Sequence, residues 1–356
     1  MSSPSCTAAI SVGIPEGLAF GIILQKSRMS SPENIKNQMA LKSWSMMKTF
    51  LSASGASTIS LGLLDLMGVA TLSPININLR STISGGAIMG VGMALGGACP
   101  GTVLAQAGEG VPSSLYTLLG GIIGATVYGI VINNPTVNSL LESTEVPGSF
   151  NTLHGLLGKP MWSIALPVGT MLVGIACTLE KLFPTPETDL ISTEKCLLKR
   201  RQWHPIYSGL ALGALQVPVN LICKTTLGTS SAFVTAVTFI TRYLPVEQEY
   251  FERFTISKSA KYLWQLISDL SIVGGSYFSS YLAGTRAEPK KLSNKEKCWA
   301  IASGFLLLFG ARAGHGCTSG QGLSQMANLS FGGMIGVASM LASGFTVGVA
   351  LSKLQK

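Results

Sequence analysis

Two of the seven cysteines stand at points where an apolar helix cannot simply continue. Cys99 precedes Pro100 and Gly101, and both proline and glycine interrupt helices. Cys317 precedes Thr318, a residue type that favours the start of a helix. If a new helix begins beside each cysteine, its free N–H groups and its dipole favour a negative charge there. We therefore expect an anion site with a soft thiol donor at each break.

The surroundings of the two cysteines resemble each other. When Cys99 is aligned on Cys317, two glycines of the first half fall on glycines of the second, namely Gly92 on Gly310 and Gly96 on Gly314. Many transporters are built from two repeats, and their broken helices meet at a central substrate site. We predict one transmembrane domain over 1–356, with inverted repeats at about 7–179 and 204–352 joined by a loop over 180–203.

The composition indicates a polytopic membrane protein. Only 12% of the 356 residues are charged, whereas 47% are hydrophobic and 41 are glycine. Soluble domains carry about 25% charged residues, and small residues let membrane helices pack closely. We therefore predict an all-α fold with eight or nine crossings and several half-helices, given the ~20 apolar residues that a crossing requires. Apolar segments are expected at about 6–24, 46–67, 85–98, 114–132, 161–179, 205–223, 232–243, 262–283, 298–313 and 329–351, with an interfacial helix at 35–48 and a short half-helix at 102–108.

The net charge of +9 comes from basic residues that gather in loops. Five Lys and Arg residues lie in each of the loops 180–203 and 285–297, whereas the polar loop 133–159 has a single lysine. By the positive-inside rule, the two basic loops face the cytosol and 133–159 faces outward. This distribution excludes nucleic-acid binding as the reason for the charge. A plasma-membrane location is expected.

The remaining chemistry-bearing residues point to neither a metal site nor a cofactor. The seven cysteines show no Cys-x-x-Cys pair and no regular spacing, which excludes a disulfide framework. Most of the others are expected to pack as small apolar residues. Arg312 lies in an apolar run, so it has to face a polar cavity or a partner. Three acidic residues in or near apolar segments, Glu16, Asp65 and Asp269, are candidates for proton coupling.

At both cysteines the chain resembles the YeeE/YedE sulfur-transport family, whose bacterial members include thiosulfate transporters. The residues 96–102, Gly-Gly-Ala-Cys-Pro-Gly-Thr, are similar to the first-half signature of this family. Residues 310–320, a Gly-Ala-Arg run that leads to Gly-Cys-Thr-Ser-Gly, are similar to the second-half signature. The similarity extends to 17–24 followed by Ser27-Arg28, to 203–205 and to 226–231, and so covers nearly the whole chain.

The resemblance implies half-helices that meet at a constricted centre, where thiols pass the anion along by hydrogen bonds to its terminal sulfur. The thiols that the resemblance assigns to the solute pathway are Cys99 and Cys317. The other residues that we expect along this pathway are Gly97, Pro100, Gly101, Thr102, Gly316, Thr318, Ser319, Arg28, Arg312 and Gln321. The chain departs from the family pattern at three places: Met29-Ser30 stand where a cysteine is usual, His315 replaces a glycine, and Gln321 replaces a common histidine.

The sequence thus favours an uptake transporter for a small sulfur-containing anion, with thiosulfate as the first candidate. Its partners would be that anion, the lipid bilayer and a small cytosolic sulfur-carrier protein. Two alternatives remain. One is a membrane sulfurtransferase that uses Cys317 as a nucleophile, although the sequence shows no His/Asp base arrangement and no cysteine pair. The other is a sensor or scaffold of the same fold that has lost transport together with the cysteine near Met29.

Overall fold

A computed structural model describes residues 6–75, 78–141, 151–186, 196–243, 249–256 and 260–354. This part of the chain is helical, apart from turns and one isolated β-bridge between Thr152 and Ser330, which confirms the all-α prediction. The elements are α1 (Cys6–Lys26), α2 (Pro32–Met39), α3 (Ser45–Leu66), α4 (Leu79–Gly96), α5 (Pro100–Glu109), α6 (Ser114–Val131), α7 (Pro135–Leu141), α8 (Leu153–Leu157), α9 (Met161–Leu182), η2 (Leu197–Lys199), α11 (Pro205–Ala214), α12 (Gln216–Cys223), α13 (Ser230–Thr241), α14 (Glu249–Glu252), α15 (Ala260–Ala283), α16 (Asn294–Ala313), the π-helix η3 (Gly320–Gln325) and α17 (Phe331–Leu354).

Five helical stretches of the described chain are long and apolar enough to cross a membrane. They are α4 with α5, α6, α9, α11 with α12, and α17. Four further helices have similar lengths of 20 to 24 residues, namely α1, α3, α15 and α16. The total of eight or nine crossings therefore stays a prediction, whereas a helical membrane-type architecture is present.

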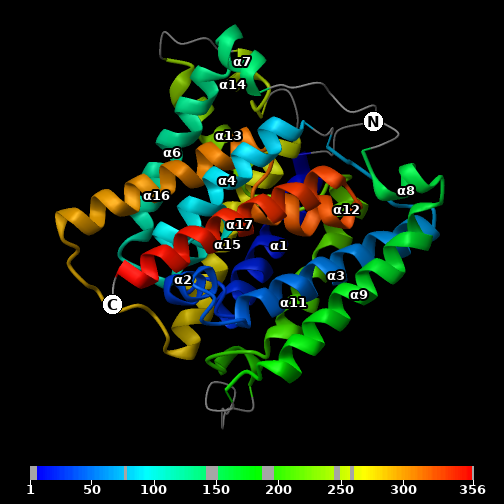
Figure 1. Cartoon of the computed structure of the whole chain (residues 1–356), viewed down its shortest axis with the longest axis horizontal. Coiled ribbons are helices and arrows are strands. Elements are labelled where there is room, and N and C mark those ends of the chain that lie inside the picture. Colours follow the sequence, from blue (N-terminus) through cyan, green and yellow to red (C-terminus); the bar gives the residue numbers. More distant parts are fainter. Residues whose placement is uncertain are drawn as a thin grey trace.

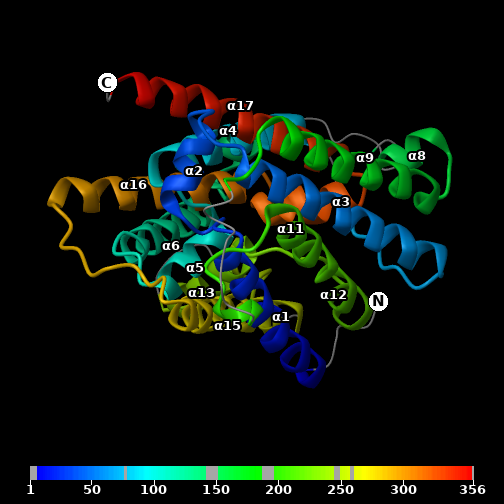
Figure 2. The same ribbon diagram turned by 90° about the horizontal axis from the view of Figure 1, so that it is seen from below.

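Glycines let α4 and α16 approach each other closely. A Cβ atom on Gly85 would overlap the backbone of Gly314, and one on Gly96 would overlap the side chain of Ser303. As the residue number increases along α4, the number of the contacting residue in or next to α16 decreases, so the two helices run antiparallel. Figures 1 and 2 both show α17 beside α4, and α17 packs on α4 as α6 packs on α16. The two glycine-rich segments thus form the middle of one side of the molecule.

The other side is built from α1, α3, α9, α11 and α15. Helix α1 packs along α15, and α3 packs between α9 and α11, with α3 and α9 side by side in both views (Figures 1 and 2). Gly275 accepts the close approach of α1, since a Cβ there would overlap the carbonyl group of Leu18. Gly275 thus serves helix packing, whereas Gly274 has more room.

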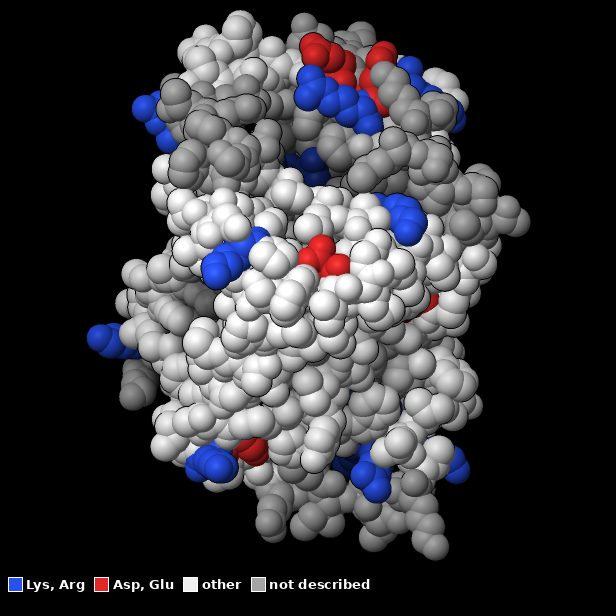
Figure 3. Space-filling model, turned by 90° about the vertical axis from the view of Figure 1, so that its right-hand side faces the viewer, with Lys and Arg blue, Asp and Glu red and all other residues white. Residues whose placement is uncertain are grey.

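One face of the molecule matches the chemistry of a bilayer. Figure 3 shows a broad band without charged side chains among the described residues, bordered on both sides by Lys, Arg, Asp and Glu. Apolar side chains of α9 contribute exposed surface, among them Met171 (58% exposed) and Ile175 (41%). Exposed apolar surface of this extent is typical of a protein that meets lipid.

The two basic loops lie at the same end of the molecule. The Lys26 ammonium at the end of α1 donates to the carbonyl oxygen of Arg200 at 2.8 Å, which belongs to the first basic loop. The neighbouring Gln25 amide donates to the Thr285 hydroxyl at 2.9 Å, at the start of the second. The C-terminal end of α1 therefore contacts both loops. An orientation with both loops in the cytosol requires that they lie at one end of the molecule.

Several boundaries differ from the sequence-based expectations. The interfacial helix expected over 35–48 is instead α2, a turn, and the start of α3 at Ser45. The stretch 205–223 divides into α11 and α12 at Leu215. The polar loop 133–159 contains the short helices α7 and α8, and its residues 142–150 lie outside the described part. The charged stretch 246–261 contains the short helix α14, and residues 244–248 and 257–259 on either side of this helix also lie outside the described part. Polar composition concealed these short helices because it is shared by loops and exposed helices.

Candidate functional site

The first break lies between α4 and α5. Helix α4 ends at Gly97, which has a φ of 65°, a left-handed conformation that favours glycine. A Cβ at Gly97 would also overlap the carbonyl oxygen of Pro32. The Gln106 side chain donates to the Gly97 carbonyl oxygen at 2.8 Å, so the freed backbone acceptor is satisfied inside the protein. The predicted interruption before Cys99 is therefore correct.

Cys99 caps the new helix with its sulfur atom. The backbone N–H of Thr102 donates to Cys99 Sγ at 3.4 Å, and the Cys99 N–H donates to the Thr102 hydroxyl at 2.7 Å. This reciprocal arrangement is a capping box in which a thiol takes the place of the usual hydroxyl. Pro100 occupies the first helical position, as expected. A Cβ at Gly101 would lie in ordinary van der Waals contact with Thr229 and Phe20, at 3.5 Å or more.

The second break lies between α16 and the π-helix η3. After Ala313 the chain turns through Gly314, His315 and Gly316, and His315 has a φ of 59°. The Gln321 side chain donates to the carbonyl oxygen of Gly314 at 2.6 Å, in the manner of Gln106 at the first break. Gln321 is thus a structural partner of the break in this chain.

Cys317 itself begins the second helix, which corrects the expectation that Thr318 and Ser319 cap it. Both of these residues are already helical, and the Gly320 N–H donates to Cys317 Sγ at 3.4 Å. Two hydroxyl groups also contact this sulfur: Thr229 Oγ1 at 3.4 Å and Ser319 Oγ at 3.2 Å. Ser319 therefore contacts the sulfur atom, and the cap position belongs to the cysteine.

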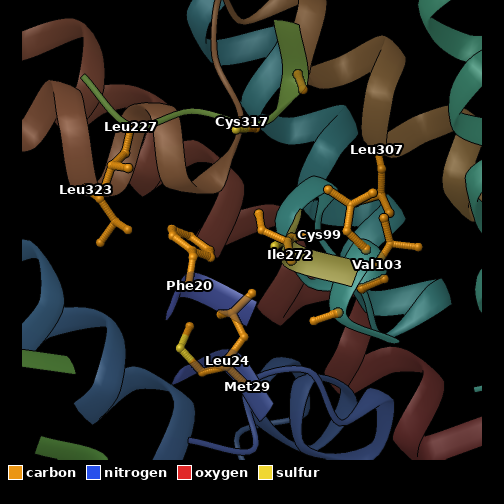
Figure 4. Packing of buried hydrophobic residues seen from close by; sticks show 14 of the residues in the cluster. Phe20, Leu24, Met29, Cys99, Val103, Leu227, Ile272, Leu307, Cys317 and Leu323 are labelled. Atoms are coloured by element: carbon orange, nitrogen blue, oxygen red, sulfur yellow. The ribbon is translucent and has the colours of Figure 1, made fainter. Parts of the chain in front are cut away.

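The two thiols lie near each other, and of the two only Cys99 lines the adjoining cavity. Cys99 is 6% exposed and Cys317 is 1% exposed, neither forms a disulfide, and they lie close enough to interact electrostatically. A cavity of about 360 Å³ is lined at its polar end by Cys99, Gly101, Thr102, Thr318 and Ser319. Figure 4 shows both cysteines above the buried apolar side chains of α1.

The rest of this cavity, which we call the thiol cavity, is apolar. Phe20, Leu24 and Met29 line it from the N-terminal segment (Figure 4), together with Phe50, Ala53, Leu212 and Leu323. Met29 therefore stands in the cavity wall at the place where the family pattern has a cysteine. A thioether can contact a soft atom but has no proton to donate. Sequence reasoning had noted the missing thiol and missed that its replacement lines the cavity.

A second cavity, of about 270 Å³, adjoins the first through Thr318 and Phe50, which line both. Five methionines line it, namely Met39, Met46, Met47, Met93 and Met340. The Thr318 hydroxyl lies 3.5 Å from Met340 Sδ and 3.8 Å from Met93 Sδ. We call this the methionine cavity. Its wall is soft and flexible, because methionine is unbranched and polarisable.

Neither of the two arginines that were predicted to serve the pathway lines the thiol cavity. Arg312 is 8% exposed; it donates to the Tyr250 hydroxyl at 2.7 Å and to Ser231 Oγ at 3.4 Å, and it lies over the Phe254 ring at 4.6 Å. Its partner is therefore an aromatic and hydroxyl pocket. Arg28 has a φ of 58° and is half-buried, and it interacts electrostatically with Glu109. Its neighbour Met29, and not Arg28, lines the thiol cavity.

Thr229 is a site residue that sequence reasoning missed. It belongs to the motif at 226–231, but nothing in that motif indicated that its hydroxyl meets a sulfur 88 residues away. Of the other cysteines whose side chains the structure describes, none lines the thiol cavity: Cys223 is buried, Cys177 is half-buried, and Cys196 and Cys298 are exposed. No group of three potential metal-binding side chains occurs among the described residues.

The chain matches the family model described as "Sulphur transport" over residues 26–346. It is 22% identical over 348 residues to the thiosulfate transporter TsuA of Escherichia coli (strain K12), an alignment that covers 94% of this chain and 92% of that protein. It is also 29% identical over 171 residues to the thiosulfate transporter TsuA of Spirochaeta thermophila, covering 45% of this chain and 52% of that protein. The family model spans both cysteine breaks.

Proposed function

Because the chain belongs to the sulphur-transport family, we propose that it is a membrane transporter that takes up a small sulfur-containing anion, with thiosulfate as the preferred solute. The observation that carries the proposal is the pair of neighbouring thiols that begin two helices: Cys99 lines the thiol cavity, and the two residues that follow Cys317, Thr318 and Ser319, line it from the second helix. The helix N-termini favour the charged oxygens of the anion. The thiols and the apolar wall suit its larger and less strongly hydrated terminal sulfur.

The route runs from the thiol cavity past Thr318 into the methionine cavity. The Thr318 hydroxyl can turn from the methionine sulfurs to an arriving anion, since its two sulfur contacts at 3.5 and 3.8 Å are weak. Gly97 and Gly316 let the backbone turn at the two breaks, and Pro100 fixes the start of α5. In this proposal Arg28 and Arg312 act on the anion through their field at a distance.

The domain consists of two inverted repeats in this proposal, and the packing of α4 on α16 supports it. Shifting each residue by the separation of the two cysteines moves Gly85 to Ser303 and Gly96 to Gly314. The contact between Gly85 and Gly314 thereby becomes the contact between Ser303 and Gly96, and both exist. The same exchange relates a second pair of contacts, Gly92 with Leu307 and Met89 with Gly310. A two-fold axis that exchanges antiparallel helices lies in the membrane plane.

We place the end that carries the loops 180–203 and 285–297 in the cytosol and the chain in the plasma membrane. The basic residues of those loops support this orientation, and Lys26 and Gln25 tie both loops to one end. A small cytosolic sulfur-carrier protein would then meet the transporter at this end.

Uptake of radiolabelled thiosulfate into proteoliposomes tests the proposal. The experiment compares the wild type with Cys99→Ser, Cys317→Ser and the control Cys298→Ser, which changes an exposed cysteine. Serine keeps the helix cap but replaces the soft sulfur, so we expect about a tenfold loss at each site variant and none at the control, in line with the ~1.5 kcal/mol of a hydrogen bond to a charged group. Excess sulfate should compete poorly because it lacks the terminal sulfur.

Equal uptake by all four proteins would remove the thiols from the mechanism. A mass increase of one sulfur on the Cys317 peptide after exposure to thiosulfate would instead indicate the sulfurtransferase. Thiosulfate binding without flux in the same vesicles would identify the sensor or scaffold.

A further inference from the structure

Two buried carboxyl groups lie beside the Cys317 break and have no part in the pathway described so far. Glu16 on α1 and Asp269 on α15 are each 4% exposed, and they interact electrostatically with each other. The Ser268 hydroxyl donates to Glu16 Oε2 at 2.5 Å. The two helices pack so closely here that a Cβ on Gly17 would overlap the Ser268 carbonyl group. The carboxyl pair is therefore enclosed between two tightly packed helices.

Asp269 has no partner that would hold a negative charge. Both of its oxygens lack a hydrogen-bond partner among the described residues. One helical turn earlier, on the same face of α15, the buried Gln265 side chain also presents an unpartnered oxygen. An ionised carboxylate at this depth is costly unless a cation accompanies it. The face formed by Gln265 and Asp269 is thus an acceptor surface that calls for a bound proton or cation.

The groups around the pair are acids as well. Glu16 and Cys317 interact electrostatically with Asp269, and Cys223 on α12 interacts with Glu16. In the part of the chain that the structure describes, no lysine, arginine or histidine acts on Asp269. Two neighbouring carboxyl groups without a base between them do not both ionise. A proton is the smallest cation that neutralises them, and no group of three metal-binding side chains stands here in the described residues.

The pair is connected to the thiol that is proposed to meet the solute. The Gln265 amide donates to the carbonyl oxygen of Gly228 at 3.5 Å, and the next residue, Thr229, contacts Cys317 Sγ at 3.4 Å. An anion that arrives at Cys317 therefore adds negative charge within electrostatic reach of Asp269. Such charge favours the uptake of a proton by Asp269, and by reciprocity a bound proton favours the anion.

We propose that Glu16 and Asp269 form a proton-binding site that couples the entry of the anion to the entry of protons. This inference rests on the proposed transport function and names its driving ion. Asp65, the third acidic candidate of the sequence, does not share the role. Its carboxylate lies at the end of α3, is half-exposed, and accepts a hydrogen bond from the Trp162 N–H at 3.0 Å.

Proteoliposomes made with the purified full chain test this site. With an acidic exterior and no sodium, the wild type should accumulate labelled thiosulfate above its equilibrium level, by about tenfold for one coupled proton and a gradient of about one pH unit. A protonophore should abolish the accumulation. Flux that only equalises the two sides, or accumulation that follows a sodium gradient instead, would overturn the proposal.

The variants Glu16→Gln and Asp269→Asn keep the size of each side chain and remove its titration. Both should lose accumulation driven by the pH gradient but retain exchange of labelled for unlabelled thiosulfate at equal pH on both sides. The matched control Asp65→Asn should behave as the wild type. Accumulation by the two variants at the wild-type level would contradict a coupling role.

Proton movement by the wild type gives a readout that needs no variant. A pH-sensitive dye should report alkalinisation of the external medium when thiosulfate is added, in proportion to the thiosulfate taken up. Exchange of thiosulfate without alkalinisation would overturn proton coupling and leave the transport function standing. Absence of any exchange by the wild type would instead overturn the transport function itself.

Discussion

The two cysteine breaks have the same design but differ in what holds them. At the first break the Cys99 sulfur is contacted by Thr102, three residues later in the same chain segment. At the second the Cys317 sulfur is contacted by Thr229 from a distant segment and by Ser319. A regular α-helix follows Cys99, whereas a π-helix follows Cys317. The first thiol is held by its local sequence, whereas the second has local contacts with Ser319 and Gly320 and a tertiary contact with Thr229 in addition.

This difference assigns different tasks to the two thiols. A capping box with a proline at the first helical position is a self-contained structure, so the first break fixes the geometry of the cavity. π-Helices are costly and occur frequently at functional sites. At the second break, Cys317 also interacts electrostatically with Asp269 and contacts Thr229 from the motif at 226–231. If the chain transports the anion as proposed, we expect the Cys317 side to be the one that responds to solute and protons.

Removing one hydroxyl at each break distinguishes these tasks. Thr229→Val should reduce thiosulfate uptake by about three- to tenfold, because Cys317 loses a hydrogen bond worth ~0.5 to 1.5 kcal/mol that orients its sulfur. Thr102→Val should instead lower the stability by about 1 kcal/mol, because it removes one half of a helix cap. Uptake kinetics and thermal unfolding of both purified variants measure the two effects. If Thr229→Val lowers stability and spares uptake, the contrast between the breaks fails.

A cysteine at position 29 tests whether a further thiol in the cavity wall improves the binding of thiosulfate. Met29 lines the thiol cavity but cannot donate a hydrogen bond. Met29→Cys places a second thiol beside Cys99 in the wall of this cavity, and we expect the KM for thiosulfate to fall by about two- to threefold, the equivalent of a weak hydrogen bond of ~0.5 kcal/mol. Met29→Ala is the matched control, since it opens the same space without adding a donor. An equal change in both variants would assign the effect to volume.

The sequence alone predicted the breaks because their causes are local. Proline, glycine and the aligned cysteines act within a few positions, and they correctly located the ends of α4 and α16. The contact between Thr229 and Cys317 could not be predicted, since it joins residues 88 positions apart and depends on how the helices pack. The cap position was wrong for a related reason. Thr318 and Ser319 are good caps in general, but here their hydroxyl groups lie near sulfur atoms inside the fold.

The aligned turn residues give the smallest expected effect and a stringent test of the comparison. Gly97 and His315 each stand two positions before a cysteine, and both have left-handed φ values, 65° and 59°. That conformation costs a residue other than glycine ~1 to 2 kcal/mol, whereas glycine loses ~0.5 to 1 kcal/mol more chain entropy on folding. His315→Gly should therefore stabilise the protein by at most about 1 kcal/mol, as thermal unfolding would show.

The opposite substitution at the first break, Gly97→Ala, helps to separate backbone strain from a role in transport. Gly97→Ala should destabilise the protein, because its Cβ would add an overlap with the Pro32 carbonyl group to the cost of the left-handed conformation. If His315 serves only the backbone turn, as Gly97 does, His315→Gly should raise the stability. Its thiosulfate uptake should then stay within about twofold of the wild type, a smaller change than the loss of one hydrogen bond produces. A gain in stability with a tenfold loss of uptake would show that His315 is kept for the solute. His315 would then act on the solute together with Cys317 and Thr229 at the second break.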